Sequence, residues 1–272
     1  LPLSNPMIAN MTIIGNSFDG DDDSEGLLLR AGTNAQLANF VVTGPAGMGE
    51  CLEFDSAETK ALAAAGAHVI LVARKVKALE AVEDEIHAAG GTSTIAPLDL
   101  TEPDAVTRLA TAIAGRWDKL DILVLSAAYL PELTPVAQIE PKQFNQALLT
   151  NLVSAQAMIA GFDTMLRNAE AGRVIGLTSS LGSAPRAYWG AYGATKAAFE
   201  NLLETYGAEV EKLSRLRVAI IDPGATRTEM RARAFPGEDP ESVKPPEVVA
   251  DRIVALLGEQ FTSPHRIRVN QT

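Results

Sequence analysis

Two kinds of hydrophobic pattern alternate along the chain from residue 60 onward. Short, continuous apolar runs such as 69–73 (Val-Ile-Leu-Val-Ala) are separated by longer segments in which apolar residues recur at helical spacing. Continuous apolar runs are typical of strands that are buried on both faces. Their alternation with helices predicts an α/β protein with a doubly wound parallel sheet that helices cover on both sides.

The same pattern predicts where the elements lie. Strands are expected at 69–73, up to about 98–99, and at 121–126, 173–179, 217–221 and 266–270. Helices are expected at 75–89, from 103, at 141–169, from about 192, and at 246–257. Neither a charged run nor a low-complexity linker divides this part of the chain, so we expect it to form a single domain.

The first 59 residues have a different character, with β-rich runs between Gly, Asn and Asp. Residues 8–15 resemble residues 37–44, and such a repeat is typical of a parallel β-helix, with chance similarity as an equally weighted alternative. Because two coils cannot bury their own faces, we expect residues 39–43 to join the parallel sheet as its first strand. The predicted division is an atypical β-rich segment at 1–36, β-helix-like or irregular, and one α/β domain at 37–272.

Charge and composition narrow the range of partners. The formal net charge is −11, and residues 1–59 hold nine of the 34 acidic side chains but only one of the 23 basic ones. This excess of negative charge argues against nucleic acid and anionic membranes as partners. No apolar run approaches about 18 residues and the N-terminus lacks the basic flank of a secretory signal, which favours a cytoplasmic protein.

Cysteine and histidine usage bears on covalent and metal chemistry. Cys51 is the only cysteine, so a disulfide framework is excluded. The three histidines show no spacing typical of metal ligands, and no metal site is expected.

The strongest candidate for chemistry lies between residues 179 and 196. Tyr192 and Lys196 are four residues apart at the start of a helical stripe, so they share one helix face. Ser179 ends an expected strand and could meet the phenol from the edge of the sheet. An ammonium beside a phenol favours the phenolate, and bringing a tyrosine from a pKa of about 10 towards neutrality takes roughly 4 kcal/mol. The three side chains then form an acid–base set, although an isolated Tyr-x-x-x-Lys is more often a solvated helix face.

A strand-end serine followed by Tyr-x-x-x-Lys on an α/β chain resembles the short-chain dehydrogenase/reductase family, over about residues 60–258. The resemblance implies a Rossmann-like fold and an oxidoreductase that interconverts a carbonyl and an alcohol. By resemblance, Ser179 orients the substrate oxygen, Tyr192 exchanges its proton, and Lys196 lowers the pKa of the tyrosine and holds the nicotinamide ribose. Asn151 resembles the asparagine that maintains a proton relay.

The glycine loop of the cofactor site departs from the family pattern. Thr43, Gly44, Gly47 and Gly49 give T-G-x-x-G-x-G, which is one residue shorter than T-G-x-x-x-G-x-G. Such a loop cradles a pyrophosphate at a helix N-terminus. Turns of a β-helix explain the same glycines equally well.

Two further positions match the family's cofactor site. Arg74, directly after the second expected strand, lies where NADP-preferring members place an arginine, and a guanidinium can pair with a 2′-phosphate. Position 73, where NAD-preferring members place an acidic residue, is Ala73. Asp99 resembles the aspartate near the adenine. The expected cofactor is therefore NADP.

Other family positions lie further along the chain. Pro223, Gly224 and Thr228 resemble the P-G-x-x-x-T turn beside the nicotinamide carboxamide. The usual N-N-A-G is replaced by Leu-Ser-Ala-Ala at 125–128, which puts the contact made by those asparagines in doubt. The residues expected to form a substrate lid are Met230, Arg231, Arg233 and Phe235.

The sequence leaves two functions open. The leading one is an NADP-dependent oxidoreductase acting on a small carbonyl or alcohol, with Tyr192 as general acid/base and a homo-oligomer expected by resemblance. The alternative is a non-catalytic or cofactor-impaired scaffold, either a binding module or a joined fragment, because the glycine loop is disrupted.

Overall fold

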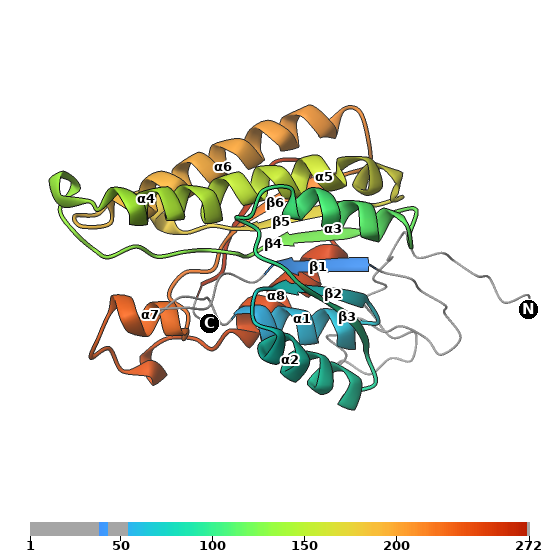
Figure 1. The fold of residues 1–272 in the computed structure, drawn as a ribbon, viewed down its shortest axis with the longest axis horizontal. Helices are drawn as coiled ribbons and strands as arrows, with labels where there is room; N and C mark the ends of the chain where they lie inside the picture. The colour runs from blue at the N-terminus through green and yellow to red at the C-terminus, as the bar shows by residue number, and fades with distance from the viewer. Residues whose placement is uncertain (1–37, 43–53, 271–272) are drawn as a thin grey trace, which may run out of the picture.

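The computed structural model describes residues 38–42 and 54–270, which form a sheet between two layers of helices (Figure 1). The described sheet has seven parallel strands in the order β3-β2-β1-β4-β5-β6-β7. The strands are β1 (Ala38–Val42), β2 (His68–Ala73), β3 (Thr92–Pro97), β4 (Ile122–Leu125), β5 (Arg173–Leu177), β6 (Arg217–Asp222) and β7 (His265–Arg268). The strand order reverses between β1 and β4, and doubly wound sheets bind ligands beside such a point, at the carboxyl ends of the strands.

Helices cover both faces of this sheet. One layer holds α1 (Phe54–Ala64), α2 (Val76–Ala88) and α8 (Glu247–Leu257). The other holds α3 (Ala105–Ala114), α4 (Pro141–Leu148), α5 (Ser154–Asn168) and α6 (Gly190–Glu211). The short helix α7 (Glu229–Ala234) follows β6. The connecting segments also contain a π-helical turn, η2 (Leu149–Val153). Three 3-10 turns complete the described elements: η1 (Val136–Gln138), η3 (Ser180–Gly182) and η4 (Pro240–Ser242).

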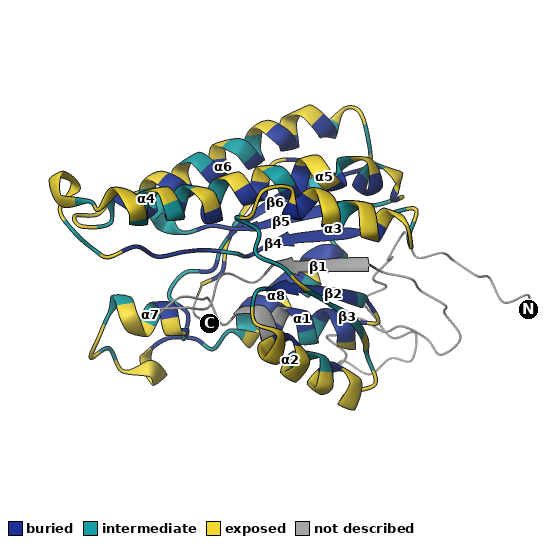
Figure 2. Ribbon diagram, viewed as in Figure 1, coloured by how far each residue is buried: buried dark blue, intermediate teal, exposed yellow. Residues whose placement is uncertain are grey.

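The period of two along each strand explains the two cores. Ile70 and Val72 of β2 pack with α3, α5 and α6, whereas Val69 and Leu71 pack with α1, α2 and α8. All four side chains are at most 2% exposed. Strands β2, β4, β5 and β6 are therefore largely buried, the edge strands β3 and β7 are only partly covered, and the outward helix faces are exposed (Figure 2). This burial on both faces confirms the doubly wound sheet that the apolar runs predict.

Several boundaries differ from the prediction. The strand expected at 173–179 ends at Leu177, so Thr178 and Ser179 start the following loop, and the strand expected at 39–43 spans Ala38–Val42. The helix expected at 141–169 is interrupted at Leu149–Val153, where the π-helical turn adds a residue between α4 and α5. Such single-turn π-helical insertions are rare, and the hydrophobic pattern did not predict this one.

Part of the prediction lies outside the described residues. This holds for the repeat at 8–15 and 37–44, whose only described positions are 38–42, and for the glycine loop at 43–49. The domain boundary at residue 36 stays a prediction. Within the described residues, none of the helices combines the length and the hydropathy that crossing a membrane requires.

Candidate active site

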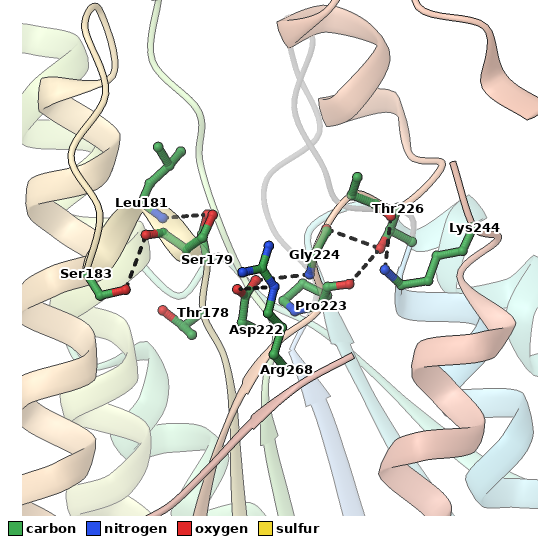
Figure 3. Close-up of polar contacts among 12 residues, drawn as sticks. Thr178, Ser179, Leu181, Ser183, Asp222, Pro223, Gly224, Thr226, Lys244 and Arg268 are labelled. Carbon is green, nitrogen blue, oxygen red and sulfur yellow. Dashed lines mark hydrogen bonds and ion pairs between the residues drawn. The ribbon is translucent and has the colours of Figure 1, made fainter. Parts of the chain in front are cut away.

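The candidate site lies at the carboxyl ends of β5 and β6, which are neighbouring parallel strands (Figure 3). The backbone N–H of Thr178 donates to the carbonyl oxygen of Ile221 at 2.8 Å, which extends the pairing of the strands by one residue. The loops that follow, which include Ser179 and Pro223, border a cavity of about 490 Å³. That volume is in the range of small-molecule sites.

Ser179 is the second residue of the loop after β5. Its backbone is extended, and its Oγ accepts a hydrogen bond from the N–H of Leu181 at 3.3 Å, which starts the 3-10 turn η3. The hydroxyl hydrogen of Ser179 remains available for a ligand in the cavity, because the Oγ only accepts in this contact.

Tyr192 and Lys196 lie one turn apart on α6, as the four-residue spacing predicts. Tyr192 is 5% exposed and borders the cavity, and Lys196 is 1% exposed. The Nζ of Lys196 donates to the carbonyl oxygen of Leu177 at 2.9 Å and lies 5.8 Å from the centroid of the Tyr192 ring. The buried ammonium thus ties α6 to the last residue of β5, two residues before Ser179.

The electrostatics of this pair differ from the sequence prediction. Burial raises the pKa of Tyr192, and the nearby Asp222 carboxylate raises it further. Burial lowers the pKa of Lys196 to about 8, against the opposing effect of the Glu200 carboxylate. The expected lowering of the phenol pKa is absent in the protein alone, because burial disfavours the phenolate and the Asp222 carboxylate acts in the same direction.

Glu200 is a buried charge that the sequence prediction missed. It follows Lys196 by one further turn of α6 and is 4% exposed. Its Oε1 accepts from the Thr178 hydroxyl at 2.6 Å, and its Oε2 accepts from the Arg266 guanidinium at 2.7 Å. The sequence did contain a signal for this residue, because Glu200 follows Lys196 by four positions and so places a carboxylate on the same, otherwise apolar, helix face.

Asn151 connects two segments of the site by hydrogen bonds. It lies in the π-helical turn η2 and is 1% exposed. Its Oδ1 accepts from the N–H of Tyr129 at 2.6 Å, and its Nδ2 donates to the Tyr129 carbonyl oxygen at 3.0 Å and to the Thr195 hydroxyl at 2.9 Å. The amide therefore joins the segment after β4 to α6, beside Tyr192 and Lys196 in the chain.

The turn after β6 also borders the cavity. It begins at Asp222, a second charged residue, after Glu200, that the sequence prediction did not identify. Asp222 Oδ1 accepts from the N–H of Gly224 at 3.0 Å, and its Oδ2 lies 3.6 Å from the Nε of Arg268. Gly224 has a φ of 65°, in the left-handed region that glycine adopts without strain. Pro223 and Gly224 border the cavity together with Thr228, whose hydroxyl oxygen accepts from the N–H of Arg231 at 3.1 Å and caps α7.

The predicted cofactor residues Arg74 and Asp99 come together at the ends of β2 and β3. An NH1-to-Oδ2 distance of 3.4 Å makes them an ion pair. Burial opposes the charge of Asp99, but hydrogen bonds from Thr101 and the Arg74 guanidinium outweigh it and lower the pKa of the carboxyl group. The Nε of Arg74 is buried and has no hydrogen-bond partner among the described residues. This N–H group could donate a hydrogen bond to an anionic oxygen of a ligand.

The remaining predicted cofactor residues, Thr43, Gly44, Gly47 and Gly49, lie outside the described residues. At 125–128, where the sequence lacks the family's asparagines, Leu125 and Ser126 are buried at the end of β4. The lid candidates Met230, Arg231 and Phe235 border the cavity. Arg233 instead donates to the carbonyl oxygen of Leu130.

Comparisons with known proteins identify the family. The family model for short chain dehydrogenase matches residues 39–239. An uncharacterized oxidoreductase of Escherichia coli K12, YciK, is 32% identical over 197 residues, which cover 71% of this chain and 77% of that protein.

Solved structures are similar over most of the chain. A short chain dehydrogenase structure from Pseudomonas syringae, described as putative, has a TM-score of 0.79 and 30% identity, covering 86% of this chain and 94% of that one. A Shigella flexneri homologue complexed with NADP has a TM-score of 0.77 and 28% identity, covering 86% and 96%. The chain therefore belongs to the short-chain dehydrogenase/reductase family and is an NAD(P)-dependent oxidoreductase with an α/β, Rossmann-like fold.

Proposed function

We propose that this protein interconverts a carbonyl and an alcohol with NADP as its cofactor, and that Tyr192 is the general acid/base. The observation that carries the proposal is that Ser179 and Tyr192, from a loop and a helix, border one cavity with the turn at Pro223 and Gly224. The buried Lys196 lies behind the phenol. A hydroxyl donor and a proton donor at one cavity, with a buried cation close to the phenol ring, fit the reduction of a polarised carbonyl.

Each side chain has a role in the proton chemistry. The Ser179 hydroxyl donates a hydrogen bond to the substrate oxygen and orients it. Tyr192 gives its phenolic proton to that oxygen as the alcohol forms, and takes it back in the reverse direction. Lys196 stabilises the phenolate that remains, and Asn151 maintains the relay that returns the proton.

The residues at the ends of β2 and β3 fit NADP. The unpartnered Nε of Arg74 and its guanidinium suit a 2′-phosphate, and Asp99 lies beside them for the adenosine end. When bound, the nicotinamide supplies or accepts the hydride. Homologues from Shigella flexneri and Escherichia coli CFT073 were solved with NADP and NADPH, which supports this choice.

Replacement of Tyr192 by Phe tests the mechanism. We expect the variant to lose roughly 10²- to 10⁴-fold in the rate of NADPH-dependent carbonyl reduction, because only the proton donor is removed. The assay is the absorbance of NADPH with a panel of aldehydes and ketones. Circular dichroism and NADPH affinity serve as controls and are expected to match the unmutated protein. Full turnover by a correctly folded variant would remove Tyr192 from the mechanism.

The non-catalytic scaffold is not favoured by the family match over 39–239. Titration with NADPH separates the two functions, because a scaffold with an impaired cofactor site would leave NADPH fluorescence unchanged. We also propose a homo-oligomer in the cytoplasm, acting on a small molecule and not on nucleic acid or membranes. The homo-oligomer and the small-molecule substrate are proposed by resemblance to the family. The location in the cytoplasm and the exclusion of nucleic acid and membranes rest on the composition and charge of the sequence.

A further inference from the structure

Part of the cavity lining is aromatic and basic, and the proposed proton chemistry does not use it. Trp189 stacks on Phe235, with ring centroids 5.7 Å apart and an interplanar angle of 30°. Trp189 also meets the Tyr192 ring edge-on, with centroids 6.1 Å apart. The guanidinium carbon of Arg186 lies 5.3 Å from the Phe235 centroid. Contacts therefore lead from the proposed proton donor through two rings to an arginine.

The arginines of this lining differ in whether a carboxylate lies near them. Three arginines border the cavity, namely Arg186, Arg231 and Arg268. Arg231 is paired with Glu238 through two hydrogen bonds of 2.6 and 2.7 Å, and Arg268 lies 3.6 Å from Asp222. Arg186 has no carboxylate in ion-pair distance among the described residues. One positive charge at the cavity is thus left without an anion.

This local charge runs against the charge of the whole protein. The chain carries a net charge of −11, although residues 1–59 account for most of it, and the described cavity lining holds three arginines and a single acidic side chain, Asp222. Arg186 contacts Phe235, and so does Arg231, whose guanidinium carbon is 3.6 Å from the ring centroid. The Phe235 ring thus contacts two guanidinium groups and the Trp189 ring.

We infer that the substrate is a carbonyl compound with an apolar, aromatic-sized body and a carboxylate at the end remote from the carbonyl. This inference rests on the proposed function, because it places the carbonyl at Ser179 and Tyr192. The body lies along Trp189 and Phe235, and the carboxylate pairs with Arg186. A guanidinium recognises a planar carboxylate with two parallel hydrogen bonds, and the cavity has room for such a molecule.

The probes are 4-carboxybenzaldehyde and its methyl ester, methyl 4-formylbenzoate, which differ in charge but share the carbonyl and the ring. Kinetics with NADPH give kcat/KM for each. Calorimetry with and without NADP⁺ gives the affinity of each independently of turnover. For the unmutated protein we expect a preference of about tenfold or more for the acid in both measurements, through KM more than kcat.

Three variants separate the role of Arg186 from general charge. Arg186→Gln is expected to bring the acid-to-ester ratio close to one while reduction of the ester continues. Arg186→Lys is expected to keep part of the preference, because the charge remains but the two-pronged geometry is lost. Arg215→Gln is the matched control, because Arg215 is an exposed arginine in the loop before β6 and away from the cavity. Its ratio is expected to be unchanged.

The outcomes distinguish this inference from the proposed function. Equal binding and turnover of acid and ester, a preference that survives Arg186→Gln, or no binding of the acid at all would overturn the inference. Reduction of the ester that depends on Tyr192 would then still support the proposed function. Conversely, selective binding of the acid without reduction of either compound would contradict the proposed function and leave the anion site in place.

Discussion

At the scale of single residues, the site is built around charged side chains that are largely removed from water. Lys196 keeps one hydrogen bond, to the Leu177 carbonyl oxygen, and Glu200 lies one turn further along α6. Burying an ammonium costs free energy that the rest of the fold must offset. Buried ionisable groups with shifted pKa values are concentrated at active sites. Two predictions follow from individual charges, one from Lys196 and one from Arg74.

The buried Lys196 is expected to make stability depend on pH. Its pKa falls from an ordinary value of 10.5 to about 8 in the folded protein. Between these values the unfolded chain binds more protons than the folded one, so the free energy of unfolding rises with pH. Relative to Lys196→Met, which cannot titrate, the unmutated protein should gain about 2 to 3 kcal/mol between pH 7 and pH 10. Urea unfolding of both proteins at the two pH values measures this difference, and a constant difference would contradict it.

Arg74 is expected to set the choice between NADPH and NADH. The unmutated protein should bind NADPH more tightly, because the guanidinium and its unpartnered Nε can pair with the 2′-phosphate. Arg74→Ala should narrow the preference by about tenfold or more. The affinity for NADH is the internal control and should change little. Equal affinities for the two cofactors in the unmutated protein would refute this role.

At the scale of elements, β5 and α6 act as a unit that places the proton donor. Gly176 of β5 faces α6, and a Cβ added there would lie 2.9 Å from Cζ of Phe199 and also collide with Leu203. The absence of a side chain at Gly176 thus lets α6 approach the strand closely. The bond from Lys196 to Leu177 closes the same contact at the site.

Gly176→Ala is expected to destabilise the protein by about 1 to 3 kcal/mol, because the core must move to accept the methyl group. Activity should fall too, since α6 carries Tyr192 and Lys196. The matched control is Gly115→Ala at the end of α3, where the added Cβ has ordinary contacts of 3.5 Å and stability should change by less than about 0.5 kcal/mol. Denaturant unfolding together with turnover measures both effects. Equal stability of the two variants would show that the close approach is not required.

At the scale of the whole molecule, the layer of α4, α5 and α6 presents apolar side chains to solvent. Leu149 and Val153, at the two ends of η2, are 41% and 48% exposed. Apolar side chains one turn apart on an outer helix face suit a contact with another protein surface. They agree with the homo-oligomer proposed above.

Light scattering is expected to give a mass of at least twice the 28.8 kDa of one chain. The double variant Leu149→Glu and Val153→Glu should shift the mass towards that of a monomer, because it places charges in the expected contact. Leu213→Glu serves as the control, because Leu213 is 75% exposed beyond the far end of α6. A monomeric mass for the unmutated protein would contradict the proposed homo-oligomer.

The sequence by itself determined the features that depend on local spacing. Apolar runs predicted six of the strands and the doubly wound sheet, and the step from Tyr192 to Lys196 predicted a shared helix face. Ser179 and the turn from Pro223 to Thr228 were recognised from residue types in a known order. Such features can be predicted from the sequence alone, because a few neighbouring residues suffice to specify them.

Only the tertiary structure decided which distant groups meet. It placed Asp222 near Tyr192, buried Glu200 against Thr178 and Arg266, and raised the phenol pKa that the sequence predicted to fall. It also paired Arg74 with Asp99 and set Arg186 over Phe235. The physical reason is that a pKa and an ion pair depend on burial and on distances between segments far apart in the chain, which hydrophobic periodicity and motif spacing do not contain.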